Sequence, residues 1–260
     1  MYVNNFDPIA FHLFSVEIRW YSLAYIFGIV LGWLLCKKIF IKNLKINEKF
    51  DDYITYLIIG MIIGGRVGYI VFYNFDYYLH NILDVFKVWE GGMSFHGGLI
   101  GVIAASIIFG GKNNQDSFLY MDLVSLVAPI GIFFGRLANF INSELYGGPT
   151  DAPWGVIFIQ IDSFSRHPSQ LYEAFLEGII LFFILLYFRN KNLLKKPGLV
   201  SSLFLIFYSI FRFIIEFFRV PDQQLGYLIF ELTMGQIISV IFILSGIILF
   251  YFKNENKQIN

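Results

Sequence analysis

The chain of 260 residues is 57% hydrophobic and only 15% charged, whereas soluble domains carry about 25% charged residues. A soluble core could not bury so much Phe, Ile and Leu, and a disordered chain would need low hydrophobicity, so both classes are excluded. The 19 basic and 19 acidic residues cancel, so no net field attracts nucleic acid, and we expect no nucleic-acid partner.

Seven apolar runs are long enough, or nearly so, to cross a bilayer as helices of about 20 residues. They lie near 20–36, 53–73, 95–110, 118–138, 171–188, 199–218 and 236–252. No linker or shift in composition divides the chain. We therefore expect an all-α integral membrane protein whose residues 1–260 form a single polytopic membrane domain. No basic leader precedes the first run, so no cleavable signal peptide is expected.

The positions of Lys and Arg predict the orientation of the chain. Twelve of these residues lie in the connections after the first, third and fifth runs and in the C-terminal tail, against four in the other connections. The C-terminus is therefore expected in the cytoplasm and the N-terminus outside. The connections 74–94, 139–170 and 219–235 would then face outside, and they are rich in Gly, Asn, Pro, Trp and Tyr.

Glycine spacing, the single cysteine and one tyrosine can also be interpreted from the sequence. Glycines recur at four-residue spacing in several runs, which allows close packing of membrane helices. Cys36 is the only cysteine, so no internal disulfide is possible, and its place at the cytoplasmic end suits an apolar filler. Tyr21, at the outer end of the first run, fits either the aromatic belt of the membrane interface or contact with a lipid headgroup.

Three arginines lie inside the apolar runs, namely Arg66, Arg136 and Arg212. Each costs about 3 kcal/mol at the centre of a membrane helix, so such residues usually face the bundle interior and bind something. Arg212 could instead be neutralised by Glu216, four residues later on the same helix. Arg66 lies off the glycine face of its helix and could extend outward to the interface.

The segment GRLANFINSELYG (135–147) concentrates polar groups at the outer end of the fourth run. Arg136 and Asn139 are three residues apart and share a helix face, and Glu144 is the best-placed carboxylate for Arg136 in the sequence. An arginine fork with amide donors suits a phosphate, whereas a single carboxylate is too little for a hard cation. We therefore expect an anion site and no metal site.

Two further segments carry candidate residues. In GGMSFHGG (91–98), His96 lies between glycine pairs that would let a substrate approach, so it is either a general base or an ordinary polar residue of the interface. In RHPSQLYE (166–173), Pro168 is expected as the first residue of the fifth span. Glu173 and Glu177 share a face of that helix and are expected to pair with Arg136 or Arg212.

These segments together resemble the prolipoprotein diacylglyceryl transferase family. GRLANFINSELYG (135–147) resembles the family signature, and GGMSFHGGLIG (91–101), RHPSQLYE (166–173) and FRFIIEFFRVPD (211–222) resemble further blocks in the same order. The runs RWYSLAY (19–25) and GGRVGYIVFYNF (64–75) fit as well. The sequence departs from the pattern at Ala138, where the family often has Gly, and in a short connection at 148–165.

The resemblance implies seven transmembrane helices with a small extracytoplasmic head, in a multi-pass protein of the bacterial plasma (inner) membrane. It implies transfer of the sn-1,2-diacylglyceryl group of phosphatidylglycerol to the thiol of a lipobox cysteine in a prolipoprotein signal peptide. The products are a thioether and glycerol phosphate, in the first step of lipoprotein maturation. No metal or organic cofactor is implied.

The resemblance and the residues together suggest roles for the polar side chains. Arg136 would bind the phosphate, and Arg212, oriented by Glu216, would be the second cation near the leaving group. His96 would be the base for the thiol, directly or with help from the arginines. The headgroup pocket would be completed by Asn139, Glu144, Gly147, Tyr21 and Arg66.

Two other classes of function remain as alternatives. A small transporter could also place Arg and Glu inside spans, but internal repeats or broken helices would be expected, and none is evident. A non-catalytic phospholipid-binding scaffold would need the phosphate site but not His96. Ion flux would favour the transporter, and lipid binding without product would favour the scaffold.

Overall fold

The computed structural model describes residues 2–14, 16–191, 193–221, 226, 228 and 231–255, apart from the side chains of Glu90 and Leu193. Within these residues, seven helices are long and apolar enough to cross a membrane: Trp20–Phe40, Leu44–Tyr73, Phe95–Lys112, Ser117–Ile141, Ser169–Asn190, Leu199–Phe218 and Met234–Glu255. The expectation of a mostly helical, multi-pass membrane protein is therefore confirmed. The second helix begins at Leu44 and not near residue 53, because the polar residues that precede the apolar run also form helical turns.

The chain divides into two compact units, residues 37–121 and residues 1–36 together with 122–260. Each unit is described by itself. The single polytopic domain and the orientation of the termini stay predictions.

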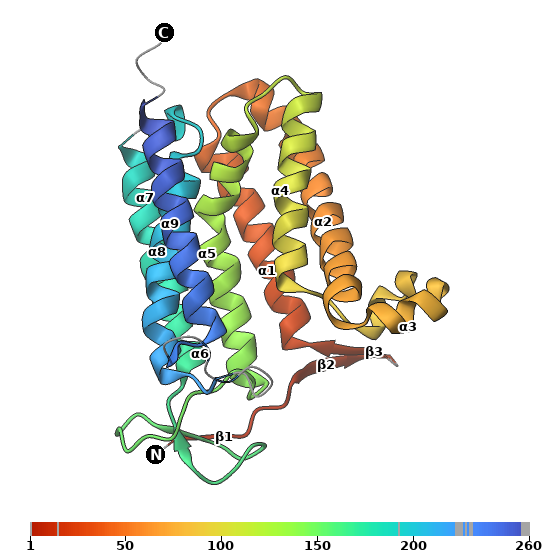
Figure 1. Cartoon of the computed structure of the whole chain (residues 1–260), viewed down its shortest axis with the longest axis vertical. Helices are drawn as coiled ribbons and strands as arrows, with labels where there is room; N and C mark the ends of the chain where they lie inside the picture. Colours follow the sequence, from red (N-terminus) through yellow and green to blue (C-terminus); the bar gives the residue numbers. More distant parts are fainter. Residues whose placement is uncertain are drawn as a thin grey trace. The chain divides into compact units, whose positions relative to one another are not determined.

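The unit of residues 37–121 is built on close packing of α2 (Leu44–Tyr73) against α4 (Phe95–Lys112) (Figure 1). A Cβ atom added at Gly60 would lie 2.8 Å from the Cβ of Ala105, and one added at Gly64 would lie 2.8 Å from the Cα of Gly101. These distances leave no room for a side chain. The four-residue glycine spacing therefore serves helix packing, as expected.

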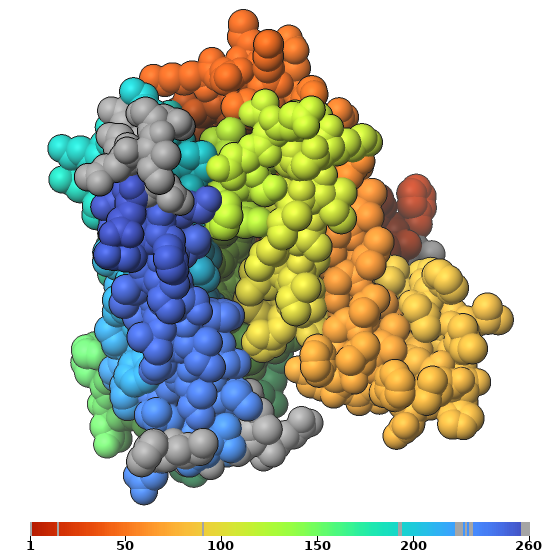
Figure 2. All heavy atoms as spheres, turned by 45° about the horizontal axis from the view of Figure 1, so that its top comes forward, coloured from red at the N-terminus to blue at the C-terminus, as the bar shows by residue number. Residues whose placement is uncertain are grey.

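A short projecting segment follows α2. It consists of α3 (Phe75–His80), η2 (Ile82–Phe86) and η3 (Val88–Glu90), and it stands out beside α2 in the space-filling view (Figure 2). Phe75, Leu83 and Phe86 are among its exposed apolar side chains. The segment leads back to α4, whose first turn is capped by the Ser94 hydroxyl.

The other unit contains the remaining helices. They are α1 (Trp20–Leu35), which continues into the π-helical η1 (Cys36–Phe40), α5 (Ser117–Ile141), α6 (Ser169–Glu173), the π-helical η4 (Ala174–Ile180), α7 (Leu181–Asn190), η5 (Leu193–Lys195), α8 (Leu199–Ile215), η6 (Glu216–Phe218) and α9 (Met234–Glu255). The helices α6, η4 and α7 form one continuous span. Pro168 lies just before this span, at the N-cap position, and not at the first helical residue as expected.

A small head lies at one end of this unit. Strand β1 (Tyr2–Asn4) pairs in parallel with β4 (Val156–Phe158), which pairs antiparallel with β5 (Ser165–Arg166), while β2 (Ile9–Leu13) and β3 (Val16–Arg19) form a hairpin. The buried Asn4 donates a hydrogen bond of 2.6 Å from its amide to the Phe140 carbonyl. This bond ties the head to the end of α5, within the polar segment 135–147.

Asp122 fixes the opposite end of α8. Its buried carboxylate accepts hydrogen bonds from the backbone N–H groups of Gly198 at 2.8 Å and Ser201 at 2.7 Å. A carboxylate at a helix N-terminus satisfies the unpaired N–H groups and the helix dipole. The charge inside α5 therefore positions α8, which carries Arg212 at its other end.

Candidate active site

Three spans of the larger unit bring six charged residues together. Span α5 contributes one arginine, the span formed by α6 and η4 contributes two glutamates, and the end of α8 with η6 contributes the rest. The set consists of Arg136, Glu173, Glu177, Arg212, Glu216 and Arg219. Their side chains are at most 17% exposed. We call this set the charge cluster.

Glu173 lies at the centre of the charge cluster and is fully buried. Its Oε2 lies 3.1 Å from Nε of Arg136, and its Oε1 contacts Nη1 of Arg212 and lies 3.2 Å from Nη1 of Arg219. A buried carboxylate needs such partners, because its removal from water without them costs roughly several kcal/mol. Glu173 therefore holds the three guanidinium groups around one point.

Arg136 pairs with acids from the fifth span and not with Glu144, so that part of the sequence interpretation is wrong. Its Nη2 lies 3.4 Å from Oε2 of Glu177, in addition to the contact with Glu173. The π-helical η4 keeps both acids on the side that faces α5. Among the described residues, Nη1 of Arg136 has no ion-pair partner, and the side chain is 17% exposed, so this end of the fork is available to an anion.

Arg212 and Glu216 pair as expected from their spacing, with Nη2 of Arg212 3.0 Å from Oε2 of Glu216. The other carboxylate oxygen accepts a hydrogen bond of 3.0 Å from the Thr233 hydroxyl. At the start of α9, a Cβ atom added at Gly235 would lie 2.7 Å from this carboxylate. Glu216 thus orients Arg212 while Glu173 holds it from the other side.

Arg219 was not among the site residues expected from the sequence. It lies 3.9 Å from Oε2 of Glu216 and is 7% exposed. Burial, and then the positive charge of Arg212, lower the pKa of the Arg219 guanidinium below its usual range; arginine nevertheless stays protonated because its ordinary pKa exceeds about 12. Its spacing of three residues from Glu216 and seven from Arg212 was the signal that could have identified it.

Asn139 and Glu144 form a separate polar pair beside the charge cluster. The amide of Asn139 donates to Oε2 of Glu144 at 3.1 Å, and Asn142 donates to the other oxygen at 3.3 Å. Asn139 is buried, whereas Glu144 is exposed. The turn that follows α5 also places Ser143 and Leu145 at positive φ, of 56° and 55°. Glu144 thus presents an oriented carboxylate at the surface of the segment.

Gly147 joins this segment to two spans. Its backbone N–H donates to the His167 carbonyl at 3.0 Å, and a Cβ atom there would lie 2.6 Å from the Phe218 carbonyl oxygen. No side chain fits this space. Gly147 therefore acts by permitting close approach of three backbone segments, and its expected part in shaping a headgroup pocket stays a prediction.

Tyr21 and Tyr208 interact electrostatically with the charge cluster, and Tyr25 also interacts with Arg136. Tyr21, half-buried in α1, interacts with Arg136 and stacks edge-on against Tyr25 at 5.2 Å between ring centroids. Tyr208 of α8 interacts with Arg136 and Glu177. Both hydroxyls are neutral donors near the arginine that we expect to bind phosphate.

His96 belongs to the unit of residues 37–121 and lies in the first turn of α4, where it is exposed. Its ring contacts the ring of the neighbouring Phe95, at 5.6 Å between ring centroids. The ring is therefore accessible, as a general base must be. Its role stays a prediction.

Arg66 does not extend outward, so that alternative in the sequence analysis is wrong. It is 4% exposed, and its guanidinium donates to the backbone carbonyls of Asp84 (2.6 Å), Val85 (2.9 Å) and Gly91 (2.6 Å). A longer contact reaches Gly92. With its N–H groups committed to the backbone, Arg66 holds the projecting segment in place, and this differs from the direct headgroup contact expected from the sequence.

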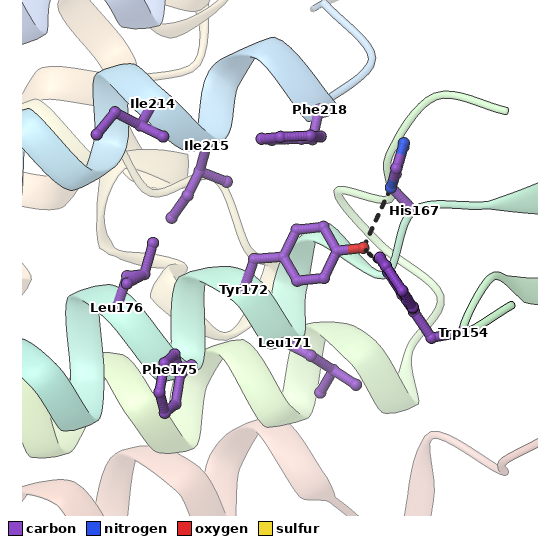
Figure 3. Close-up of a pocket in the computed structure, with 9 residues that line it drawn as sticks. All are labelled: Trp154, His167, Leu171, Tyr172, Phe175, Leu176, Ile214, Ile215 and Phe218. Atoms are coloured by element: carbon purple, nitrogen blue, oxygen red, sulfur yellow. Dashed lines mark hydrogen bonds between the residues drawn. The ribbon is translucent and has the colours of Figure 1, made fainter. Parts of the chain in front are cut away.

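An apolar pocket of about 440 Å³ is lined in part by residues of α6, η4, α8 and η6, the elements that also carry members of the charge cluster (Figure 3). Its floor is the buried Ile215, and Phe175 and Trp154 are largely exposed at its edge. Tyr172 points toward His167 and Trp154 at one end, accepting a hydrogen bond of 2.8 Å from the indole N–H and lying 3.1 Å from Nδ1 of His167 (Figure 3). The pocket thus combines an apolar lining with one polar end.

Protonation of His167 should change this polar end. Burial lowers the pKa of His167 from its ordinary value of 6.5. The neutral ring therefore stabilises the fold fully above pH 6.5, and this contribution is lost as the pH falls through the folded pKa. We expect the NMR signal of the Trp154 indole N–H to shift between about pH 7 and pH 5, because protonated Nδ1 cannot accept from Tyr172. In His167→Asn, whose amide oxygen accepts but does not titrate, the shift should vanish, and a shift that persists would contradict the assignment.

The arrangement is suited to binding an anion next to buried arginines. Within the described part of the chain, no group of three or more His, Cys, Asp or Glu side chains could hold a metal ion. Guanidinium groups bind phosphate oxygens in pairs and stabilise charge that grows on a departing phosphate. The described elements therefore fit transfer chemistry in which an anionic group leaves.

Comparison with known proteins decides the family. The family model for prolipoprotein diacylglyceryl transferase matches residues 8–252. The chain belongs to this family. A phosphatidylglycerol–prolipoprotein diacylglyceryl transferase of Rickettsia bellii is 50% identical over 258 residues, covering 98% of both chains. Proteins of the same name from Azospirillum brasilense and Rhodopseudomonas palustris are 48% and 46% identical over 93% and 94% of this chain and cover 92% and 88% of their own length.

Membership of the family agrees with the resemblance carried by the sequence segments. The match covers both units and every residue of the charge cluster. It favours an enzyme over the transporter and the non-catalytic scaffold. Asp222, the last residue of the block 211–222, lies outside the described residues.

Proposed function

We propose that this protein transfers the sn-1,2-diacylglyceryl group of phosphatidylglycerol to the thiol of a lipobox cysteine in a prolipoprotein. The charge cluster is the observation that carries the proposal, because it places three buried guanidinium groups around one point near the polar 135–147 segment. We place the enzyme in the bacterial inner membrane, with the charge cluster toward its outer face, where a translocated signal peptide presents its cysteine.

The reaction needs no nucleophile from the enzyme. The substrate sulfur attacks the carbon of the diacylglyceryl group that is bonded to a phosphate oxygen. The C–S bond forms, and the C–O bond between that carbon and the phosphate oxygen breaks. The proton of the thiol is lost to a base, and glycerol phosphate leaves with the electron pair of the broken bond. A thiol has an ordinary pKa of about 8.5, so a base or a positive field helps it to react at neutral pH.

Arg136 binds the phosphate through the end of its fork that faces away from Glu173 and Glu177. Arg212 and Arg219 stabilise the charge that grows on the leaving oxygen, because donors positioned before the reaction need no reorganisation. Asn139 orients Glu144, and this carboxylate accepts hydrogen bonds from the glycerol hydroxyls of the headgroup. Tyr21 contacts the headgroup from α1.

His96 removes the proton of the thiol. We expect His96→Gln to lower the rate at neutral pH by about a hundredfold, since general-base catalysis contributes about 10²–10⁴. The loss should be smaller near pH 9, where the thiol ionises without help. The rate of transfer to a peptide, measured between about pH 6.5 and pH 9, provides the test. An equal loss at every pH would argue against a base role.

The direct test is a transfer assay with purified protein, phosphatidylglycerol and a lipobox peptide, read by mass spectrometry. We expect a diacylglyceryl adduct on the cysteine and one glycerol phosphate for each adduct. A peptide with serine in place of the cysteine serves as the control and should stay unmodified. Bound phosphatidylglycerol without any adduct, from folded protein, would instead support the lipid-binding scaffold.

A further inference from the structure

The charge cluster is electrically neutral as it stands. It contains three guanidinium groups and three carboxylates, all of which are paired with at least one group of opposite charge. The other titratable groups that interact with it, Tyr21, Tyr25 and Tyr208, are phenols, a type of group whose ordinary pKa is about 10. A neutral set is expected at this depth, because a net charge removed from water is costly.

A phosphodiester adds one negative charge to this balance. The headgroup of phosphatidylglycerol is ionised at neutral pH and carries no compensating cation. If all three carboxylates stayed ionised, the complex would have a net charge of −1 in a buried site. The anion would also compete with Glu173 and Glu177 for the N–H groups of Arg136.

Glu177 is the carboxylate that the charge cluster stabilises least. Glu173 contacts three arginines, and Glu216 contacts Arg212, Arg219 and Thr233. By contrast, Glu177 has a single contact, at 3.4 Å with Arg136. Its Oε1 is buried and has neither a hydrogen-bond nor an ion-pair partner among the described residues. Oε2 of Glu173 and Oε2 of Glu216 also lack a hydrogen bond, but they lie 3.1 Å and 3.0 Å from an arginine nitrogen.

We propose that binding of the phosphodiester headgroup takes up one proton from solvent and that the Glu177 carboxyl group holds it. This inference rests on the proposed function, because it assumes that the phosphodiester binds in the charge cluster. Protonation keeps the complex neutral and releases Nη2 of Arg136 from Glu177, so that both ends of the fork can bind phosphate oxygens. No covalent bond other than the new O–H bond forms in this step, and the proton returns to solvent when the anion leaves.

The proposal predicts a specific pH dependence of binding. The groups that face Glu177 are Arg136 on α5, Glu173 on α6, Tyr208 and Arg212 on α8, and Arg219 after η6. All keep their charge state in the complex, so one proton is linked to each bound headgroup. Over the range in which free Glu177 is ionised, the affinity should fall about tenfold for each rise of one pH unit.

The experiment is calorimetric titration of the purified protein in detergent with dihexanoyl phosphatidylglycerol, in buffers of different ionisation enthalpy. The slope of binding enthalpy against buffer ionisation enthalpy measures the protons taken up. We expect about one proton for the native protein at neutral pH. In Glu177→Gln, which is isosteric and mimics the protonated carboxyl group, we expect about zero and an affinity that is independent of pH.

Glu48→Gln is the matched control, because it removes the same charge from an exposed position in α2. It should take up about one proton, as the native protein does. Infrared difference spectra of the native protein provide a second measurement that needs no variant. Addition of the lipid should produce one new protonated-carboxyl band.

Binding without proton uptake, or unchanged uptake in Glu177→Gln, would overturn the inference. The transfer assay on the same preparations separates this result from failure of the proposed function. Transfer without proton uptake would overturn only the role of Glu177. Absence of both binding and transfer in folded protein would overturn the proposed function and this inference together.

Discussion

Transfer of the diacylglyceryl group is expected to be lost when Arg136 is replaced by alanine. Among the described residues, Nη1 of Arg136 has no ion-pair partner and the side chain is the most exposed of the three arginines of the charge cluster, and removal of one preorganised donor to a developing anion costs about 10²–10³ in rate. Since Arg136 also binds the ground-state phosphate, we expect a loss of about a thousandfold or more. The measurement is the initial rate of adduct formation with phosphatidylglycerol and a lipobox peptide.

Arg136→Lys separates the charge of Arg136 from its geometry. Lysine keeps the positive charge opposite Glu173 and Glu177 but lacks the planar fork. We expect a folded protein whose rate lies between those of the native enzyme and Arg136→Ala. Size-exclusion chromatography in detergent shows whether each variant is folded. Normal turnover by folded Arg136→Ala would show that the phosphate role is wrong.

Glu173→Gln is expected to have the largest effect on stability. The substitution keeps the shape of the side chain but leaves three buried guanidinium groups with two carboxylates. Breaking a buried ion pair by removing one partner costs about 3–5 kcal/mol. We therefore expect a loss of at least about 3 kcal/mol in the free energy of unfolding, measured by titration with denaturing detergent.

Glu144→Gln is the matched control for Glu173→Gln. Glu144 carries the same charge but is exposed, and among the described residues its carboxylate is hydrogen-bonded to the side-chain amides of Asn139 and Asn142 and to no arginine. Its replacement should change the free energy of unfolding by no more than about 0.5 kcal/mol. Equal stability of the two variants would mean that Glu173 is not the centre of the charge cluster.

The expected pairing of Arg212 with Glu216 was confirmed because their contact is local. Residues four apart on one helix meet whatever the rest of the chain does, and the structure places their charged atoms 3.0 Å apart. The same reasoning applies to the shared face of Glu173 and Glu177, since both contact Arg136. The close packing between glycines of α2 and α4 also follows a local spacing rule.

The interpretation of Arg136 and Arg66 was incomplete because their partners are not local. Glu177 is 41 residues from Arg136 along the chain, and the carbonyl of Gly91 is 25 residues from Arg66. No spacing rule predicts which of several distant acids will pair with Arg136. Nor does one predict that Arg66 will donate to backbone carbonyls and not extend to the membrane interface. Arg219 was passed over because it follows the apolar run, yet the end of α8 turns it back toward Glu173.

The sequence alone determined that this chain has seven segments long and apolar enough to cross a membrane and which family it resembles. Both conclusions rest on properties that each segment carries by itself, namely the length and hydropathy of a span and the order of residues in a polar block. Within the described residues, the tertiary structure decided how the charges are paired, where guanidinium N–H groups are left without an ion-pair partner, and which glutamate has the fewest partners. Those properties depend on the packing of three spans, because the energy of a buried charge is set by the groups that surround it in space and not by its neighbours in sequence.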